Sequence, residues 1–379
     1  MKVLNVNAML DTKVGGGTAE RTFQLTRYLA GQGVVCTVLT LDTGLPAERI
    51  KALAPARIVA LPKLWSRYQV PWPAFDQIRR LVAEVDIIHL MGHWSILNAY
   101  VYLVARSAGR PYVVCPAGCL PIVTRSGLLK RIYNLVFGYR IIQNASAWIA
   151  VTAGEFPAFR EYGIDSKRIT VIPNGVAADD FQVSSPLPGD PLLPEGAPYI
   201  LFIGRLNPVK GPDLLLEAFG RIASEFPAWR LIYAGPDEGM QGALEQGATA
   251  LGLRERVSFS GFLGGGLKTA AYMAARLVVV PSRSDAMSIV AVEAGICATP
   301  VLMTDQCGLN ELRLVDEGLV VPATVDGLAA GLRLALADSD RLRAWGYAWQ
   351  ALVRERYLWS RNGAAFQTLL EKAVATPKG

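Results

Sequence analysis

The fold is decided by residues 277 to 303, which read LVVVPSRSDAMSIVAVEAGICATPVLM. A run of β-branched residues ends at Pro281, and a short polar loop follows it. An apolar helix is expected from Ser288 to Cys297, and a second apolar run closes the segment. Strand, loop, helix and strand in this order indicate two parallel strands joined by a crossover helix. Such a unit is typical of a sheet that helices cover on both faces.

The same alternation extends outward from this segment in both directions. Strands are expected at residues 3–6, 34–41, 58–61, 86–90, 112–115, 147–151 and 170–172, and, in the rear half, at 199–203, 230–234, 257–260, 277–280 and 301–303. Helices are expected between them, notably at 19–30, 213–226, 267–275 and 288–297, and the chain after residue 323 is expected to be helical. These patterns predict two parallel α/β sheets.

Five prolines between residues 179 and 198 interrupt both kinds of periodicity, so a linker is predicted there. We therefore expect two Rossmann-like domains, at residues 1–180 and 195–358. An amphipathic helix is predicted at the end of the chain, and residues 359–379 are expected to pack back on the first domain.

The composition excludes several classes of protein. Half of the 379 residues are hydrophobic, and 38 basic against 32 acidic residues give a net charge of +6. This modest excess suits anionic small molecules or acidic lipid surfaces and is too weak to indicate nucleic acid. Apolar runs stay far below the ~18 residues of a spanning helix. The start, MKVLNVNAML, is interpreted as a strand and not a signal sequence. Five cysteines without metal-type spacing predict reduced thiols in the cytoplasm.

Three glycines, Gly15, Gly16 and Gly17, lie between the first expected strand and the first expected helix. They let the backbone approach a ligand, and the helix start attracts an anion. A tight turn without a ligand is the alternative. A dinucleotide-binding loop with Asp42 as the ribose acid is a second alternative, although GGGTAE lacks the GxGxxG spacing.

Two cations follow the strand at residues 199–203. Gly204 and Arg205 leave the strand, and Lys210 precedes the next helix. Open α/β sheets bind ligands at this end of their strands. The planar fork of an arginine and the point charge of a lysine can together neutralise a diphosphate. Two solvated surface charges are the alternative.

Two carboxylates belong to the segment quoted first. Asp285 lies in the loop and Glu293 on the helix eight residues later. Carboxylates are strong acceptors for sugar hydroxyls, and the helix start between them can hold phosphate. That helix start is formed by Ala286, Met287 and Ser288. In the alternative interpretation Asp285 or Ser284 caps the helix and Glu293 is exposed.

Several motifs occur in a definite order along the chain. They are GGG at 15–17, IPNGV at 172–176, GRLNPVKG at 204–211, SFSGFL at 258–263 and PSRSDAMSIVAVEAGICATPVL at 281–302. In this order they resemble the family-four retaining glycosyltransferases, also classed as glycosyl transferases group 1. The resemblance implies the GT-B fold, in which two Rossmann-like domains face an interdomain cleft.

The resemblance also implies an activity. A hexosyltransferase-type enzyme (EC 2.4) of this family moves a sugar, with retention, from a nucleotide sugar to an acceptor. For this chain we expect a UDP- or GDP-sugar as donor and a glycan or lipid-linked acceptor in surface polysaccharide or glycolipid synthesis. No cofactor and no metal are expected, because no Asp-x-Asp follows a front-half strand in a loop.

The matching positions imply roles for individual residues. Arg205 and Lys210 match the pair that holds the donor diphosphate, with Gly16 and its neighbours beside it. Glu293 matches the acid that binds the ribose. Phe262 and Leu263 match a segment beside the base.

Two positions depart from the family pattern. Asp285 stands where a glutamate usually contacts the transferred sugar, and Ala117 stands where many relatives have a histidine near that sugar. His93, beside Trp94, is the candidate to replace the histidine, and His89 is close to it in sequence. A structural imidazole is the alternative for both. These departures leave open a catalytically impaired protein that binds nucleotide or a partner.

Two front-half stretches, residues 61–75 and 125–140, combine cations with aromatic and apolar residues. In the second stretch the residues that can share one helical face are Leu128, Ile132, Leu135, Val136 and Tyr139. A basic amphipathic helix suits an anionic bilayer. We therefore expect a cytoplasmic protein that binds the inner face of the membrane. An ordinary core-facing helix is the alternative.

Overall fold

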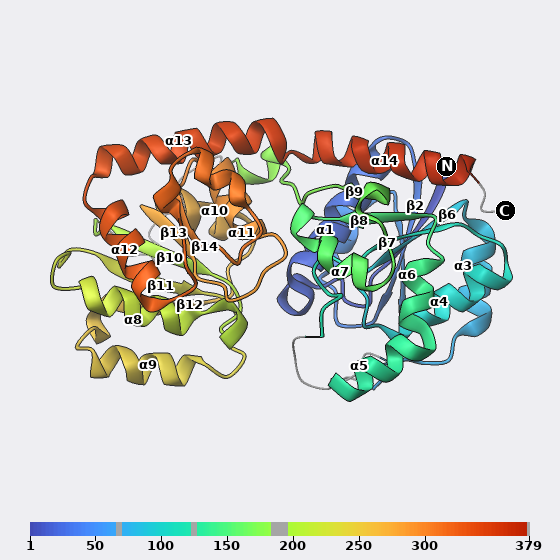
Figure 1. Cartoon of the computed structure of the whole chain (residues 1–379), viewed down its shortest axis with the longest axis horizontal. Coiled ribbons are helices and arrows are strands. Elements are labelled where there is room, and N and C mark those ends of the chain that lie inside the picture. The colour runs from blue at the N-terminus through green and yellow to red at the C-terminus, as the bar shows by residue number, and fades with distance from the viewer. Residues whose placement is uncertain (66–69, 123–126, 183–195, 377–379) are drawn as a thin grey trace. The chain divides into compact units, whose positions relative to one another are not determined.

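The structure is a computed structural model that describes residues 1–65, 70–122, 127–182 and 196–376, with residues 12–14 described by their backbone alone. It contains two compact α/β units (Figure 1). The first unit consists of Met1–Asn174 together with Trp359–Gly379, and the second of Gly175–Leu358. Each unit is built on its own parallel sheet, which confirms the predicted fold class.

The first unit has a seven-stranded sheet in the order β3-β2-β1-β6-β7-β8-β9, with every neighbouring pair parallel. Its strands are β1 (Lys2–Val6), β2 (Val35–Leu41), β3 (Arg57–Leu61), β6 (Ile87–Met91), β7 (Tyr112–Cys115), β8 (Ala147–Ala150) and β9 (Ile169–Val171). All seven predicted strands are confirmed within one or two residues. A short antiparallel pair, β4 (Lys63–Trp65) and β5 (Val70–Pro71), was not predicted.

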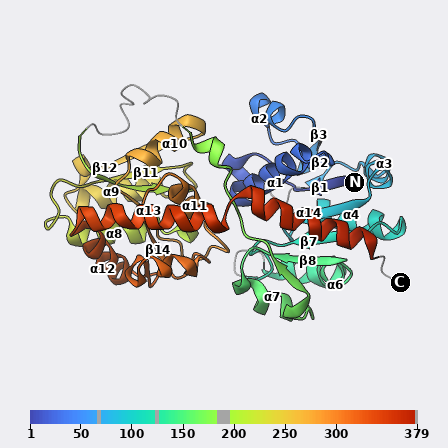
Figure 2. The same cartoon turned by 90° about the horizontal axis from the view of Figure 1, so that it is seen from above.

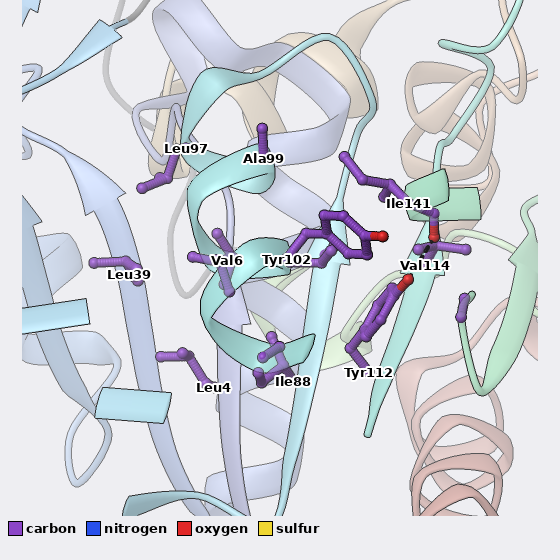
Figure 3. Close-up of a cluster of buried hydrophobic side chains, with 14 of the residues drawn as sticks. Leu4, Val6, Leu39, Ile88, Leu97, Ala99, Tyr102, Tyr112, Val114 and Ile141 are labelled. Carbon is purple, nitrogen blue, oxygen red and sulfur yellow. Dashed lines mark hydrogen bonds between the residues drawn. The ribbon is translucent and has the colours of Figure 1, made fainter. Parts of the chain in front are cut away.

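Helices surround this sheet. They are α1 (Thr12–Gly31), α2 (Ala47–Ala52), α3 (Phe75–Glu84), α4 (Ile96–Ser107), α5 (Gly127–Tyr133), α6 (Tyr139–Gln143), α7 (Phe156–Glu161) and α14 (Trp359–Ala375). The final helix, α14, packs on α1, β6 and β7 (Figure 2). Helices α3 and α4 pack on one another, and Figure 3 shows the apolar side chains of α4 against the strands. Tyr112 donates a hydrogen bond of 2.8 Å from its hydroxyl to the carbonyl of Ile141 within this core.

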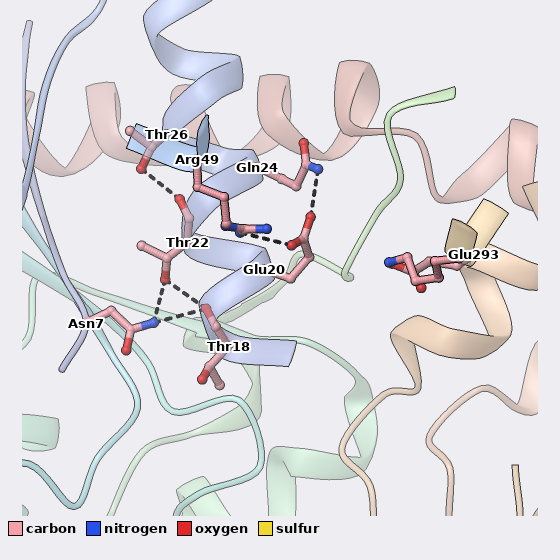
Figure 4. A network of polar contacts seen from close by, with 9 residues as sticks. Asn7, Thr18, Glu20, Thr22, Gln24, Thr26, Arg49 and Glu293 are labelled. Atoms are coloured by element: carbon pink, nitrogen blue, oxygen red, sulfur yellow. Dashed lines mark hydrogen bonds and ion pairs between the residues drawn. The ribbon is translucent and has the colours of Figure 1, made fainter. Parts of the chain in front are cut away.

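The glycine-rich segment is the main correction to the predicted elements. The first helix was expected to begin at Ala19, after a glycine loop; α1 instead starts at Thr12 and contains the three glycines, but it consists of two helical pieces that meet at a kink within the glycines. Its helical geometry is interrupted at Gly16, which has φ 54° and ψ −136°. A side chain at Gly15 would come within 2.7 Å of the carbonyl oxygen of Met9, so only glycine fits there. Polar bonds from Asn7 to Thr18 and Thr22 fix the following turns (Figure 4).

The second unit has a six-stranded sheet in the order β12-β11-β10-β13-β14-β15, again parallel throughout. Its strands are β10 (Tyr199–Ile203), β11 (Arg230–Ala234), β12 (Val257–Gly261), β13 (Leu277–Val280), β14 (Val301–Thr304) and β15 (Val320–Val321). Its helices are α8 (Pro212–Ile222), α9 (Gln241–Ala250), α10 (Gly265–Ala274), α11 (Ile289–Ile296), α12 (Val325–Leu336) and α13 (Ser339–Arg356). The five predicted strands are confirmed, and the two-residue strand β15 was not predicted.

The helices of the second unit cover its sheet on both sides. Helix α8 packs against α9 and α12, whereas α11 packs against α10 and α13. Figure 1 shows these helices around β10, β11, β13 and β14. Strands β10 and β13 are almost wholly buried, which explains why they read as continuous apolar runs.

The chain passes from the first unit to the second between Asn174 and Gly175, and it returns between Leu358 and Trp359. Of the predicted linker, residues 183–195 lie outside the described residues. The short turn η4 (Ala178–Phe181) precedes them and belongs to the second unit. There the ring of Phe181 lies 6.5 Å, between centroids, from the ring of Tyr272 on α10. A buried aromatic therefore fixes η4 to this unit.

The strand order reverses beside the first strand of each sheet. In the first sheet β2 and β3 follow β1 toward one edge, and the chain continues with β6 on the other side of β1. In the second sheet β11 and β12 follow β10 toward one edge, and β13 lies on the other side of β10. Loops that leave the carboxyl ends of such neighbouring strands diverge to opposite faces and leave a crevice, where α/β proteins bind ligands. In the second unit these are the loops that carry Arg205, Lys210 and Asp285.

Candidate functional site

One polar network joins the loops after β10, β11 and β13 in the second unit. The Lys210 ammonium donates to the Asp285 carboxylate at 2.5 Å. The side chain of Asn207 accepts from the Lys210 backbone N–H at 3.0 Å and donates to Glu238 at 2.7 Å. Glu238 also accepts from Arg205 at 2.9 Å. The structure thus brings together three residues predicted separately from the sequence: Arg205, Lys210 and Asp285.

Glu238 was not predicted as a site residue. It lies beyond the carboxyl end of β11, the neighbour of β10, and its two oxygens hold Arg205 and Asn207. Polar residues that follow neighbouring parallel strands meet at one edge of the sheet, and Glu238 could have been predicted as a site residue on this basis.

Gly211 allows the loop after β10 to touch the end of β13. Its backbone is left-handed, with φ 67°, and a side chain there would come within 2.1 Å of the carbonyl oxygen of Pro281. Gly235 has the same role after β11, because a side chain there would clash with the carbonyl oxygen of Gly204. Both glycines keep the loops of the network close together.

We expect Gly211→Ala to lower the free energy of unfolding by about 1–3 kcal/mol, because a left-handed alanine is strained and its Cβ meets backbone. The loop that carries Lys210 must shift, so activity should fall as well. Denaturant unfolding and a transfer assay measure the two effects. The control is Gly242→Ala on α9, where a side chain meets nothing within 4 Å. Equal stability of the two variants would contradict this account.

Asp285, Ala286 and Met287 lie just before the N-cap of helix α11. Its N-cap is Ser288, whose hydroxyl accepts from the Ala291 N–H at 3.3 Å. Neither Asp285 nor Ser284 caps the helix, so that alternative is wrong. The backbone N–H of Asp285 donates to the carbonyl of Gln306 at 2.8 Å. The loop after β14 thereby fixes the helix start, with Met287 and Ser288 buried.

Glu293 is 5% exposed, so the alternative that it is a surface residue is wrong as well. Its carboxylate accepts from the Lys268 ammonium at 2.7 Å and from the Tyr272 hydroxyl at 2.8 Å. Burial, and then the neighbouring Glu293, raise the pKa of Tyr272 well above its usual range, so this hydroxyl stays protonated. Lys268 and Tyr272 were not predicted as site residues.

Phe262 and Leu263 follow β12 at the same edge of the sheet. Phe262 is 43% exposed, whereas Leu263 is buried. A half-exposed aromatic next to backbone amides can lie against a planar base.

The two histidines of the chain both lie in the first unit and are buried. His89 on β6 contacts the side-chain oxygen of Asn5 at 3.1 Å, and burial lowers its pKa to about 3. His93 is 2% exposed, its Nε2 lies 2.9 Å from Asn134, and burial lowers its pKa to about 4. This geometry favours the structural alternative for both rings. A catalytic role for His93 stays a prediction of the sequence.

Ala117 follows β7 in a left-handed turn, with φ 49° at Ala117 and 79° at Gly118. The Gly118 N–H donates to the buried carboxylate of Glu155 at 2.6 Å. At the position where relatives are expected to have a histidine, this turn therefore has only backbone groups and the methyl group of Ala117.

Of the stretch predicted as a basic amphipathic helix, residues 125 and 126 lie outside the described residues, and residues 127–140 belong to α5, the π-helical turn η1 (Asn134–Gly138) and α6. Tyr133 and Phe137 pack against the core of the first unit. The exposed large apolar side chains of this segment are Leu128, Leu129, Ile132, Leu135, Val136 and Tyr139. Leu128 is 72% and Leu135 77% exposed, so the alternative of an ordinary core-facing helix does not account for them.

Among the described residues, no helix has both the length and the apolar character needed to cross a bilayer.

Comparison with known proteins shows that both halves of the chain are similar to glycosyltransferases. Residues 15–180 match the family described as Glycosyltransferase Family 4, and residues 186–351 match Glycosyl transferases group 1. A D-inositol 3-phosphate glycosyltransferase from Geodermatophilus obscurus is 27% identical over 385 residues, which cover 89% of this chain and 83% of that protein.

Solved structures match over nearly the whole chain. Sucrose-phosphate synthase from Thermosynechococcus elongatus has a TM-score of 0.79 at 20% identity and covers 99% of each chain. Anabaena HepE, solved in complex with UDP and glucose, has a TM-score of 0.78 at 20% identity, over 98% of this chain and 100% of that one. These likenesses confirm the GT-B fold.

Proposed function

The chain belongs to the glycosyltransferases, because its front half matches family 4 and its rear half matches group 1. From this premise we propose that it moves a sugar from a UDP- or GDP-sugar to a glycan or lipid-linked acceptor. The activity class is hexosyl transfer. Membership in these families excludes the alternative function of a nicotinamide-dependent oxidoreductase, which the three glycines and Asp42 had suggested. The choice of donor, the retention of configuration and the pathway, surface polysaccharide or glycolipid synthesis, are parts of the proposal.

The network around Lys210 is the observation that carries the proposal. Arg205 and Lys210 each bear a positive charge at the switch point of the second sheet, and each is paired with a carboxylate. A diphosphate offers the same cations more negative charge and more oxygen acceptors than one carboxylate does. We propose that the donor diphosphate takes the place of Asp285 on Lys210.

Asp285 then becomes available to the transferred sugar. Once released, its carboxylate can accept hydrogen bonds from sugar hydroxyls, as the resemblance implies for this position. Glu293 binds the ribose from α11, and Phe262 with Leu263 flank the base. The glycines Gly15 to Gly17 remain a prediction for a further donor contact.

In the proposed reaction the bond from the anomeric carbon to the diphosphate oxygen breaks, and a bond from that carbon to the acceptor oxygen forms on the same face. The leaving diphosphate takes the proton of the acceptor hydroxyl. Arg205 and Lys210 stabilise the charge that develops on the diphosphate. We propose no metal in this step, because two fixed cations supply the positive charge.

A screen of nucleotide sugars by thermal unfolding tests the proposal. A ligand present at a hundred times its Kd stabilises the folded protein by about 2.7 kcal/mol. We expect one UDP- or GDP-sugar to raise the melting temperature, and we expect the same shift in EDTA. Transfer or hydrolysis of that donor by the purified protein then separates an enzyme from an impaired relative. No shift with any UDP- or GDP-sugar would contradict the proposal.

We further propose that α5, η1 and α6 bind an anionic membrane surface, where a lipid-linked acceptor would lie. Residues 127–143 contain three cations, Lys130, Arg131 and Arg140, and no acidic residue. The exposed apolar side chains named above accompany these cations. Exposed apolar side chains with cations at their border suit insertion at the level of lipid headgroups.

We expect Leu128→Glu together with Leu135→Glu to reduce binding to anionic vesicles at least about tenfold, because each burial of a leucine contributes ~1.5–3 kcal/mol. Sedimentation with vesicles with and without anionic lipid measures the bound fraction. The control is Leu314→Glu in the second unit, where the native side chain is 65% exposed. Unchanged binding by the double variant would contradict the proposed surface.

A further inference from the structure

Glu293 is the only charged residue on the short apolar helix α11, which reads IVAVEAGI. Its carboxylate is almost completely buried. An isolated buried carboxylate is costly unless donors surround it, and truncation of such a donor is felt strongly. The donors around Glu293 therefore decide how this side chain is oriented.

Both donors come from α10. Lys268 and Tyr272 are four residues apart, so they lie on one face of that helix. Lys268 bonds one carboxylate oxygen, at 2.7 Å, and Tyr272 bonds the other, at 2.8 Å. Each oxygen keeps lone-pair capacity for a further hydrogen bond, because a carboxylate has about four acceptor sites.

The Lys268 side chain is itself held in place. Its ammonium lies 5.7 Å from the centroid of the Phe181 ring, a cation–π arrangement, and the same ring lies near Tyr272. The turn η4 packs on α10 through these residues. Three elements, η4, α10 and α11, thus fix one carboxylate from different sides.

We propose that Lys268 and Tyr272 are positioning residues that fix the Glu293 carboxylate as a hydrogen-bond acceptor for the ribose hydroxyls of the donor. This inference rests on the proposed function, in which Glu293 binds the ribose. Lys268 donates to one carboxylate oxygen and Tyr272 to the other, so the two partners together hold the plane of the carboxylate in a single orientation. A ribonucleotide then gains hydrogen bonds that a 2′-deoxy nucleotide lacks, so the pair sets a preference for ribose.

The test compares the binding of nucleotides that differ by one hydroxyl. UDP, GDP and their 2′-deoxy forms are titrated calorimetrically into the full-length protein. We expect the wild-type protein to prefer the ribonucleotide by about ten- to a hundredfold, the value of a hydrogen bond to a charged group. Lys268→Met should lose most of this preference while it still binds the diphosphate, and Tyr272→Phe should lose part of it. Lys268→Arg should retain it.

Thermal unfolding of each variant shows that the protein is folded, and Arg276→Met, at the exposed residue 276 just after α10, is the matched control. If Lys268→Met and Tyr272→Phe keep the wild-type preference while Glu293→Gln loses it, the positioning role is overturned and the ribose contact stands. If Glu293→Gln also keeps the preference, the ribose contact is wrong and the inference falls with it. If neither UDP nor GDP binds, the proposed function itself fails.

Discussion

Replacing Lys210 with alanine should lower turnover at saturating donor by about a hundred- to a thousandfold. This is the effect expected when one preorganised charge contact to a developing anion is removed. Lys210 suits this role because the side chain of Asn207 fixes its backbone and because its ammonium already holds a carboxylate at the switch point. Initial rates at saturating donor and acceptor measure the effect.

The control for Lys210→Ala is Arg276→Ala, which removes a cation from the surface of the same unit. It should retain near wild-type turnover, because exposed charges contribute little to the folded state. A Lys210→Ala protein that is folded and transfers sugar at the wild-type rate would refute the proposed role of the network.

Asp285→Asn should separate binding from transfer. The substitution removes the negative charge that pairs with Lys210, so a nucleoside diphosphate without sugar should bind as tightly as in the wild-type protein or more tightly. Transfer should fall about ten- to a hundredfold, because the hydrogen bonds of a charged acceptor to the sugar are weakened. Titration with UDP and GDP and a transfer assay measure the two effects.

Asp285→Glu supplies the second half of this test. Glutamate is the usual residue at this position in the family, and it has one more methylene of reach. The variant should keep the negative charge and much of the activity, whereas Asp285→Asn should not. Weaker diphosphate binding by Asp285→Asn, with unchanged transfer, would contradict the proposed exchange of Asp285 for the donor.

The sheets were predictable because their strands are buried on both faces. Strands such as β10 and β13 consist of continuous apolar residues, and that pattern is visible without tertiary information. Strand β15 is only two residues long and gives no such pattern. The short helical piece of α1 before the kink at Gly16 was missed because glycines are poor helix formers, and the need for glycine at residue 15 depends on its close contact with Met9.

The grouping of the candidate site residues was predictable where it depends on position along a strand. Arg205, Lys210 and Asp285 all follow strands of the second sheet, and the ligand-binding edge of such a sheet is known from its strand order. Lys268 and Tyr272 lie on a helix, and nothing in their sequence spacing connects them with Glu293. Their role depends on how α10 packs against α11, which is a property of the folded chain.

The burial of His93 illustrates a different limit. Its place after β6 made it a candidate for the catalytic histidine, but its pairing with Asn134 depends on the π-helical turn η1, and Asn134 lies 41 residues further along the chain. Sequence position alone does not distinguish an imidazole that faces a ligand from one that is buried in the core.

A structure of the protein with a bound nucleoside diphosphate tests the central claim most directly. The account predicts that the diphosphate lies against Arg205 and Lys210, that Asp285 has released Lys210, and that the ribose hydroxyls bond to Glu293. A nucleotide bound away from these residues, or a Lys210–Asp285 pair that stays closed beside it, would contradict the account.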